Sequence, residues 1–159
     1  MLLIVDMCVC IDLQNGECLD KVQKLPYDIA VPDVIETECD SPTFSAILRA
    51  GFSALHLDEK YMRDIYELNK DYPGLSIVDA FCLKAAQLNG AILVTGDSLL
   101  RKTAGESGLL VHGTLWLLDE MVRYNVISKT CAANCLADML ETGSRLPDKE
   151  CRKRFELWK

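Results

Sequence analysis

Short apolar runs alternate with amphipathic stretches along most of the chain. Each apolar run has the length of a buried strand, and the amphipathic stretches repeat their apolar positions with the period of a helix. The predicted strands are residues 2–5, 28–32, 52–57, 91–95 and 109–112. Strands that alternate with helices favour right-handed crossovers and a parallel sheet with helices on both faces.

Helices are predicted between the strands and after the last one. The predicted ranges are a first helix ending near residue 16, then 33–40, 43–50 after a break at Pro42, 58–72, 76–89, 97–107, and further helices from residue 115. The last of these are interrupted at Gly143 and Pro147, which are both helix-breaking residue types. We therefore predict one α/β domain of 159 residues, with a core at about 1–118 and a helical extension at about 119–159.

The composition is that of an ordinary globular protein with an acidic balance. Half of the residues are hydrophobic, and the formal net charge is −7. A protein that binds nucleic acid by charge alone is usually basic, so a site for phosphate here needs a metal ion or a local basic patch. No apolar run approaches the length of a membrane span, and the N-terminal stretch lacks the pattern of a signal peptide. We expect a cytoplasmic protein without a membrane partner.

Eight cysteines are scattered through the sequence. Several lie within apolar patterns, where a reduced thiol packs like a small hydrophobic side chain. Cys131 and Cys135 are one helical turn apart, but the chain holds two histidines and no C-x-x-C pair, so a zinc site is the less favoured interpretation.

Acidic residues occur where the predicted strands end. Asp6 ends the first strand and Asp97 follows the fourth; Asp79 lies in the first turn of the buried helix 76–89, and Glu38 lies on the inward stripe of the helix 33–40. Each has a simple local explanation: Asp6 and Asp97 as helix caps, Asp79 within a capping box begun by Ser76, and Glu38 as a partly solvated helix residue.

The four acids are nevertheless expected at one edge of one sheet, because parallel strands present their carboxyl ends together. Clustered carboxylates repel one another unless a cation is present, and hard oxygen ligands select Mg²⁺ or Mn²⁺. Such an ion can activate water for attack on a phosphodiester. The spacing thus indicates a metal-dependent site that cleaves phosphoryl bonds.

Three segments carry a resemblance to a known family. "LSIVDAFCLKAAQLNGAILVTGDSLLRKTAGESGLLVHGTL" resembles the C-terminal half of a PIN domain, "LLIVDMCVCIDL" is similar to that family's opening strand and Asp, and "VPDVIETEC" resembles its P-x-x-V-x-x-E-L segment. These motifs occur in the family's order, from residue 1 to about 118.

The resemblance implies a three-layer α/β fold around a five-stranded parallel sheet. It also implies an Mg²⁺- or Mn²⁺-dependent ribonuclease of the kind that includes VapC-type toxins. Its metal-binding and catalytic residues would be Asp6, Glu38, Asp79 and Asp97, with Thr95 as a supporting hydroxyl beside Asp97. The family commonly has a small hydroxyl or amide residue two positions after the first Asp, whereas this chain has Cys8.

RNA contacts would have to come from basic side chains near the acids. Arg101 and Lys102 follow Asp97 by about one helical turn and are our candidates, although a solvated helix face explains them equally simply. The C-terminal cluster of Lys149, Arg152, Lys153 and Arg154 is another basic patch, more typical of a solvated surface. Trp116 is expected in the core or at a dimer contact, and His112 is expected to be structural.

The leading interpretation is therefore an endoribonuclease that hydrolyses RNA with carboxylate-held metal and activated water. It could be the toxin of a toxin–antitoxin pair, with a cognate antitoxin and a homodimer as expected partners. The alternative is a non-catalytic PIN-like module that binds RNA or protein. Other doubly wound classes fit less well: a receiver domain needs a lysine after strand five, a dehalogenase-like phosphatase needs Asp-x-Asp, and no glycine-rich nucleotide loop occurs.

Overall fold

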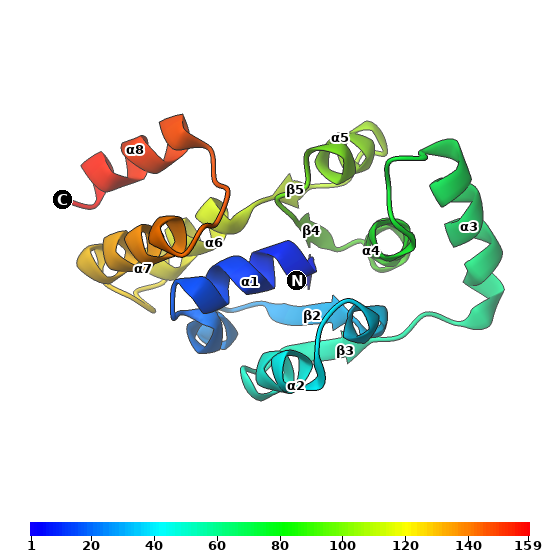
Figure 1. Ribbon diagram of the computed structural model, residues 1–159, viewed down its shortest axis with the longest axis horizontal. Helices are drawn as coiled ribbons and strands as arrows, with labels where there is room; N and C mark the ends of the chain where they lie inside the picture. The colour runs from blue at the N-terminus through cyan, green and yellow to red at the C-terminus, as the bar shows by residue number, and fades with distance from the viewer.

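A computed structural model describes all 159 residues. The fold is a parallel sheet that lies between layers of helices (Figure 1). The strands are β1 (Leu2–Val5), β2 (Asp28–Pro32), β3 (Ser53–Leu55), β4 (Ile92–Val94) and β5 (Val111–His112). They pair in the order β3-β2-β1-β4-β5, and every pair is parallel. The predicted α/β class with a five-stranded parallel sheet is confirmed, and β3, β4 and β5 are shorter than their predicted ranges.

Eight α-helices and three short 3-10 helices connect and cover the strands. The α-helices are α1 (Met7–Asn15), α2 (Ser41–Arg49), α3 (Met62–Asp71), α4 (Ile77–Asn89), α5 (Ser98–Glu106), α6 (Thr114–Arg123), α7 (Lys129–Glu141) and α8 (Asp148–Leu157). The 3-10 helices are Leu19–Lys24, Asp33–Thr37 and Glu59–Tyr61. Gly143 and Pro147 lie between α7 and α8, as predicted.

Two helix predictions are wrong in detail. Pro42 does not interrupt a helix, because α2 starts at Ser41 and holds the proline in its first turn, where its missing N–H is not needed. The predicted helix 33–40 is only the 3-10 helix Asp33–Thr37, and Pro32 belongs to β2.

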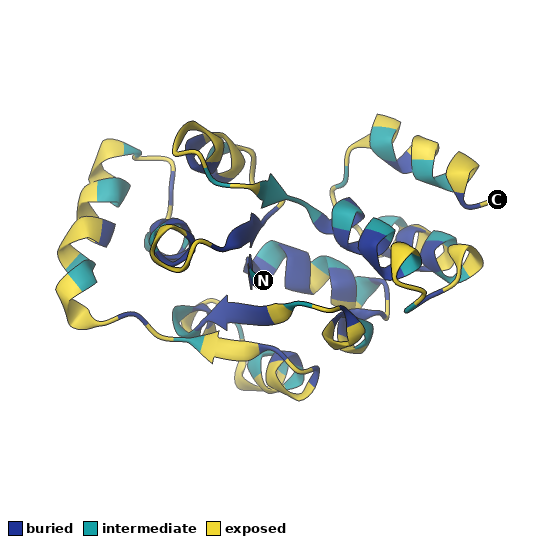
Figure 2. Cartoon of the chain, turned by 180° about the vertical axis from the view of Figure 1, so that it is seen from behind, coloured by how far each residue is buried: buried dark blue, intermediate teal, exposed yellow.

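The alternation of side chains along the central strands divides the core into two layers. Leu3 and Val5 of β1 belong to a cluster that includes side chains of α1, α6 and α7. Ile4 points the other way, into a second cluster that contains side chains of α4 and α5. Figure 2 shows the result: the central strands are buried, whereas β3 at the sheet edge is largely exposed.

Local signals explain where α4 begins and ends. Ser76 accepts a hydrogen bond from the N–H of Asp79, and Asp79 accepts one from the N–H of Ser76, which completes the predicted capping box. Gly90 ends the helix with a φ of 56°, a left-handed conformation that glycine adopts without strain.

The last three helices pack on the side of the sheet that α1 covers. At Gly16, an added Cβ would stand 2.9 Å from the carbonyl oxygen of Cys135, so the α1 end and α7 approach too closely for a larger residue. α8 is fixed by an ion pair of 2.7 Å between Arg154 and Asp119 and by the buried side chain of Trp158. Residues of α6, α7 and α8 therefore share one core with β1.

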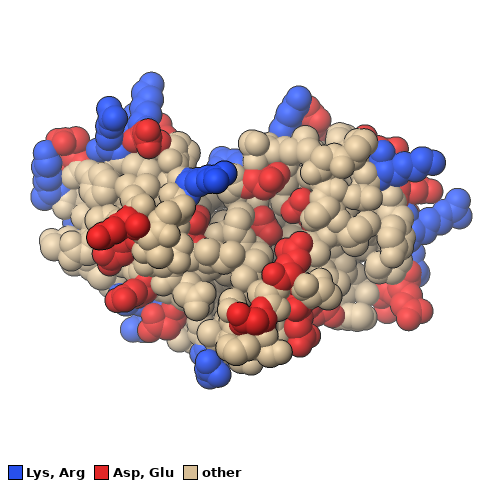
Figure 3. Space-filling view, in the orientation of Figure 1, with Lys and Arg blue, Asp and Glu red and all other residues tan.

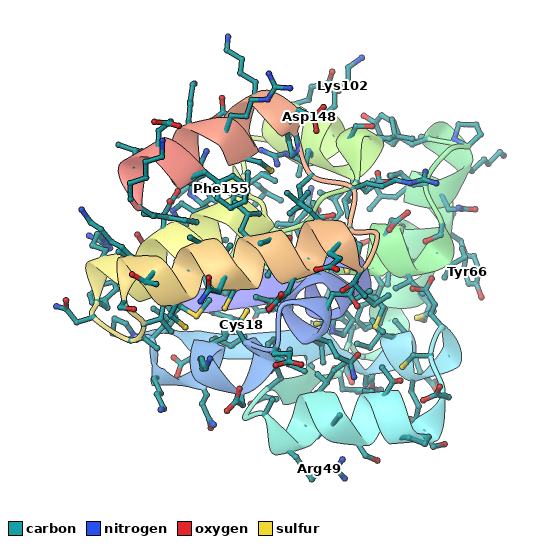
Figure 4. All side chains as sticks on the ribbon, turned by 60° about the vertical axis from the view of Figure 1, so that its left-hand side comes forward. Cys18, Arg49, Tyr66, Lys102, Asp148 and Phe155 are labelled. Carbon is teal, nitrogen blue, oxygen red and sulfur yellow. The ribbon has the colours of Figure 1, made fainter.

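The eight cysteines are free thiols. Figure 4 shows sulfur atoms near Cys18, below α7, in the layer between α7 and the N-terminal elements. Among the helices, none combines the length and the apolar character needed to span a membrane.

The topology places a crevice between β1 and β4. From β1 the chain moves through β2 to β3, and it then returns to the other side of β1 to form β4 and β5. Ligands of open parallel sheets bind at such a switch point, beyond the carboxyl ends of the strands.

Candidate active site at the carboxyl edge of the sheet

Asp6 occupies the switch point directly after β1. Its side chain is only 6% exposed and accepts three kinds of hydrogen bond: from the N–H of Met7 (2.7 Å), the thiol of Cys8 (3.1 Å) and the hydroxyl of Thr95 (2.8 Å). Asp6 is also the residue that caps α1. These contacts hold the carboxylate rigidly at the start of the helix.

Thr95 and Cys8 form a small network around Asp6. Thr95 is fully buried; its hydroxyl donates to Asp6 and accepts a hydrogen bond from the N–H of Asp97 at 3.1 Å. The predicted hydroxyl beside Asp97 thus serves the carboxylate of Asp6 and the backbone of Asp97. The Cys8 sulfur accepts from the N–H of Gly96 at 3.3 Å, so the thiol joins the Asp6 carboxylate to the backbone that follows β4.

The thiol of Cys8 remains a donor over the neutral pH range. Burial and the adjacent Asp6 carboxylate raise its pKa to about 12, which keeps the sulfur protonated. Cys8 can therefore donate to Asp6 while it accepts from the Gly96 backbone.

Asp79 and Asp97 both stand at helix starts with one oxygen engaged. Asp97 caps α5 by accepting from the N–H of Leu100 at 2.7 Å, and Asp79 accepts from the N–H of Ser76 at 2.9 Å. The local explanation by capping is therefore correct for both. In each residue the second carboxylate oxygen makes no hydrogen bond and remains open to a ligand.

Glu38 reaches the site from a different local structure than predicted. It is the residue that ends the 3-10 helix Asp33–Thr37, with its N–H bonded to the carbonyl of Ile35. The inward stripe of an α-helix therefore does not exist here. Its side chain nevertheless lines the same pocket as the three aspartates.

One open pocket of about 710 Å³ brings the four predicted acids together. Its wall consists of Asp6, Met7, Cys8, Ile11, Asp12, Glu38, Ser76, Asp79, Gly96, Asp97 and Arg145. Figure 3 shows acidic side chains gathered around the hollowed middle of one face, with Lys and Arg mainly toward its outer edges. The pocket is thus an acidic recess at the rim of the sheet.

Two charged residues of this pocket were not predicted from the sequence. Asp12 follows Cys8 by four residues on α1, and this spacing places both on one helix face, a signal that was available. Its carboxylate accepts a hydrogen bond of 2.6 Å from the hydroxyl of Thr114. Arg145 lies between α7 and α8, and no local pattern in the sequence distinguishes it.

The acids influence one another electrostatically. Burial raises the pKa of Asp6 above its ordinary value, and the charge of Asp79 adds to this, although the hydrogen bonds from Cys8 and Thr95 oppose it. Burial also raises the pKa of Glu38, with further contributions from Asp6 and Asp79. The pocket therefore favours uptake of positive charge, either as a proton on a carboxyl group or as a bound cation.

The donor set fits a hard divalent cation, although the side chains are not gathered around one point. No group of three His, Cys, Asp or Glu side chains stands in an arrangement that could hold a metal ion. Each of Asp79 and Asp97 has one free oxygen, and Glu38 makes no hydrogen bond through its carboxylate. Carboxylate oxygens are what Mg²⁺ and Mn²⁺ prefer, so the chemistry of the donors fits these ions.

The two candidate RNA contacts differ in position. Arg101 lines a second cavity next to the acidic pocket, whereas Lys102 lines neither of the two. In Figure 4 the Lys102 side chain extends outward from its helix. In the C-terminal basic cluster, Lys153 pairs with Glu150 and Arg154 pairs with both Asp119 and Glu150.

Comparison with known proteins identifies one family. The family model described as the PIN domain matches residues 2–159, which is nearly the whole chain. Searches among curated proteins and among solved structures find no match.

Proposed function

The chain belongs to the PIN-domain family, and from this premise we propose that it is an Mg²⁺- or Mn²⁺-dependent endoribonuclease. Membership in a family of nuclease-like fold supports hydrolysis of phosphodiester bonds as the general activity. The observation that carries the finer proposal is the convergence of Asp6, Glu38, Asp79 and Asp97, from four separate segments, on one pocket at the switch point.

The four carboxylates have graded roles in this proposal. Asp6 is buried and held by three donors, so it would act as the fixed ligand. Asp79 and Asp97 would turn their free oxygens to the cation while they continue to cap their helices. Glu38, which has no hydrogen bond to break, would complete the set. A divalent cation held there supplies a water of lowered pKa and stabilises negative charge on the phosphate.

The proposal is tested by cleavage of RNA with purified protein. We expect cleavage with Mg²⁺ or Mn²⁺ and none after addition of EDTA. Asp97→Asn should lower kcat/KM by about a hundredfold, because it removes a charged ligand worth several kcal/mol of transition-state stabilisation. Asparagine caps helices as well as aspartate does, so the fold should be retained.

The chain offers a matched control for this substitution. Asp40 caps α2 by accepting from the N–H of Thr43 at 2.7 Å, the same geometry as Asp97, but it does not line the pocket. Asp40→Asn should leave cleavage unchanged. Cleavage that persists in Asp97→Asn, or that falls equally in both variants, would remove the assignment.

A non-catalytic module is the second candidate, and one observation favours it. No three acids stand in an arrangement that could hold a metal ion. Calorimetric titration with Mn²⁺ separates the two candidates. Heat of binding with a stoichiometry near one supports the enzyme, whereas neither binding nor cleavage supports a module that binds RNA or protein.

The resemblance to VapC-type toxins adds finer parts to the proposal. We propose RNA as the substrate, a cytoplasmic location, a homodimer, and a cognate antitoxin as partner if the protein is a toxin. Light scattering tests the dimer. A short neighbouring gene that encodes a DNA-binding start and an amphipathic tail would support the antitoxin, and growth arrest on expression of the chain alone would support the toxin.

A further inference from the structure

A second cavity opens directly beside the acidic pocket. It has a volume of about 470 Å³, within the range of cavities that bind small ligands. Its wall includes Arg101, His112, Trp116, Arg145 and Arg154. Gly96 and Arg145 line both the cavity and the pocket, so the two recesses are continuous along the rim of the sheet.

The charges of this cavity are only partly compensated. Arg154 forms ion pairs with Asp119 at 2.7 Å and with Glu150 at 2.8 Å. Arg101 and Arg145 take part in none of the ion pairs or side-chain hydrogen bonds of the protein. In a chain with a net charge of −7, two unpaired guanidinium groups therefore face one recess.

The exposed side chain of Arg101 lies beside Gly113 at the cavity. An added Cβ on Gly113 would stand 2.9 Å from Nη1 of Arg101, so the guanidinium lies against the Gly113 backbone. Gly113 itself has an extended conformation that any residue can adopt. The glycine thus provides room for the arginine.

A stacked pair of rings contributes to the same wall. The rings of His112 and Trp116 are 4.2 Å apart at their centroids and 7° from parallel, and Tyr27 packs against Trp116 at 5.9 Å. Burial and the charge of Arg101 lower the pKa of His112, so this imidazole is neutral at pH 7. One part of the wall is therefore aromatic, formed by His112 and Trp116, and the positive charge of the cavity comes from the arginines.

We propose that this cavity binds a phosphate-bearing nucleotide of single-stranded RNA adjacent to the bond that is cleaved, with Arg101 and Arg145 contacting the phosphate. Arginine guanidinium groups suit phosphate oxygens, and aromatic side chains suit a nucleoside. The inference rests on the proposed function, because the acidic pocket defines where the reacting phosphodiester lies. In a continuous strand, the nucleotide next to the reacting phosphodiester would then lie near Gly96 and Arg145, which line both recesses.

Binding of a short fluorescein-labelled single-stranded RNA, measured by anisotropy in EDTA, tests the proposal without cleavage. We expect Arg101→Gln and Arg145→Gln each to weaken binding about tenfold, the scale of a lost charge-assisted hydrogen bond. Each variant should also make the negative slope of log K against log salt shallower by about 0.7, the value for one phosphate contact on a single strand. Arg152→Gln is the control, since Arg152 is an exposed arginine of α8 that does not line the cavity.

Titration with adenosine 5′-monophosphate, followed by the indole and imidazole NMR signals, localises the contact. We expect shifts of the Trp116 and His112 signals with the monophosphate and much smaller ones with adenosine, since the phosphate anchors the ligand. The proposal is overturned if all three arginine variants lose the same affinity for the RNA, or if the two cavity variants bind it as wild type does.

The outcomes distinguish this inference from the proposed function. Site-dependent RNA binding without metal-dependent cleavage supports nucleotide binding in the cavity and rejects the nuclease. Metal-dependent cleavage with unchanged binding and cleavage in both cavity variants supports the nuclease and rejects the inference.

Discussion

The acidic pocket and the adjoining cavity lie on the same rim but have opposite charge. The pocket holds five carboxylates and one arginine, whereas the cavity holds three arginines and one glutamate. The pocket acids come from the ends of β1 and β4, from α1 and α4, and, for Glu38, from the end of the 3-10 helix that follows β2. The cavity takes Arg145, Glu150 and Arg154 from the last helices and the turn before them.

The two recesses also differ in how their charged groups are held. Four of the five pocket carboxylates are fixed by N–H, thiol or hydroxyl donors, none of which neutralises their charge, and the Glu38 carboxylate makes no hydrogen bond. In the cavity, Arg154 is neutralised by ion pairs while Arg101 and Arg145 are not. Under the proposed function, the acidic pocket would hold a cation, and the cavity would bind the RNA strand on which that cation acts.

The largest expected difference between the two recesses is in the effect of substitutions on the affinity for a divalent ion. We expect Asp79→Asn to weaken Mn²⁺ binding about a hundredfold, on the scale of losing one charged ligand from a small site. Arg145→Gln should strengthen it slightly, by about twofold, because a positive charge leaves the pocket wall. Isothermal titration calorimetry measures both, and a loss of affinity in Arg145→Gln would contradict the comparison.

Reversing the charge of Arg145 should make the cavity wall more negative, because this residue lines both recesses. We expect Arg145→Glu to weaken RNA binding in EDTA about thirtyfold, more than the neutral Arg145→Gln, because repulsion is added to the lost contact. Anisotropy at two salt concentrations measures the effect, and high salt should reduce it. Equal affinities of the two variants would show that Arg145 does not face phosphate.

Glu120 offers a contrast to the acids of the pocket. Burial opposes its ionisation, but hydrogen bonds from Arg123 and Tyr27 prevail and lower its pKa, whereas the pKa of Asp6 is raised. A carboxylate with a lowered folded-state pKa stabilises the protein above its unfolded pKa, and this contribution is lost as the pH falls through the folded-state value.

Glu120→Gln should therefore destabilise the protein by about 1 kcal/mol at pH 7, and by less at pH 4 and below. The loss should loosen the aromatic wall, because Tyr27 donates to Glu120 and packs against Trp116. Thermal unfolding of both proteins at pH 7 and pH 4 measures the difference. A difference in stability between the two proteins that is the same at pH 7 and pH 4 would contradict the role of the ionised carboxylate.

The smallest expected effect concerns Gly113. Gly113→Ser adds a Cβ at 2.9 Å from Arg101 Nη1, which should displace the flexible guanidinium and weaken RNA binding two- to threefold, about 0.5 kcal/mol. The backbone there is extended, and serine is a good cap for α6, so stability should be unchanged or slightly higher. Unchanged RNA affinity with retained stability would indicate that the position of Arg101 is not critical.

Local signals predicted much of the fold. β1, β2, α4 and the breaks after α7 occur where apolar runs, Ser76, Gly90, Gly143 and Pro147 indicated. The prediction failed at residues 33–40, because a stretch of that length can form a 3-10 helix followed by a loop as readily as an α-helix, and tertiary contacts decide between them. The division of the chain near residue 118 stays a prediction.

The sequence by itself determined that Asp6, Asp79 and Asp97 lie at the carboxyl edge of one parallel sheet, whereas the α-helix predicted to carry Glu38 there does not form. Neighbouring residues decide where a strand ends and which residue caps a helix, and chain handedness makes the crossovers right-handed. Asp6, Asp79 and Asp97 could therefore be placed without knowledge of any distant contact.

Only the tertiary structure decided what surrounds those acids. Arg145 lines the same two recesses as Gly96 because α7 packs closely on α1 and α8 is tied to Asp119, and these contacts join segments far apart in the chain. Such placement depends on how side chains fill a shared core, and no local periodicity encodes it. The acidic edge is thus a property of the chain pattern, whereas the unpaired arginines beside it are a consequence of packing.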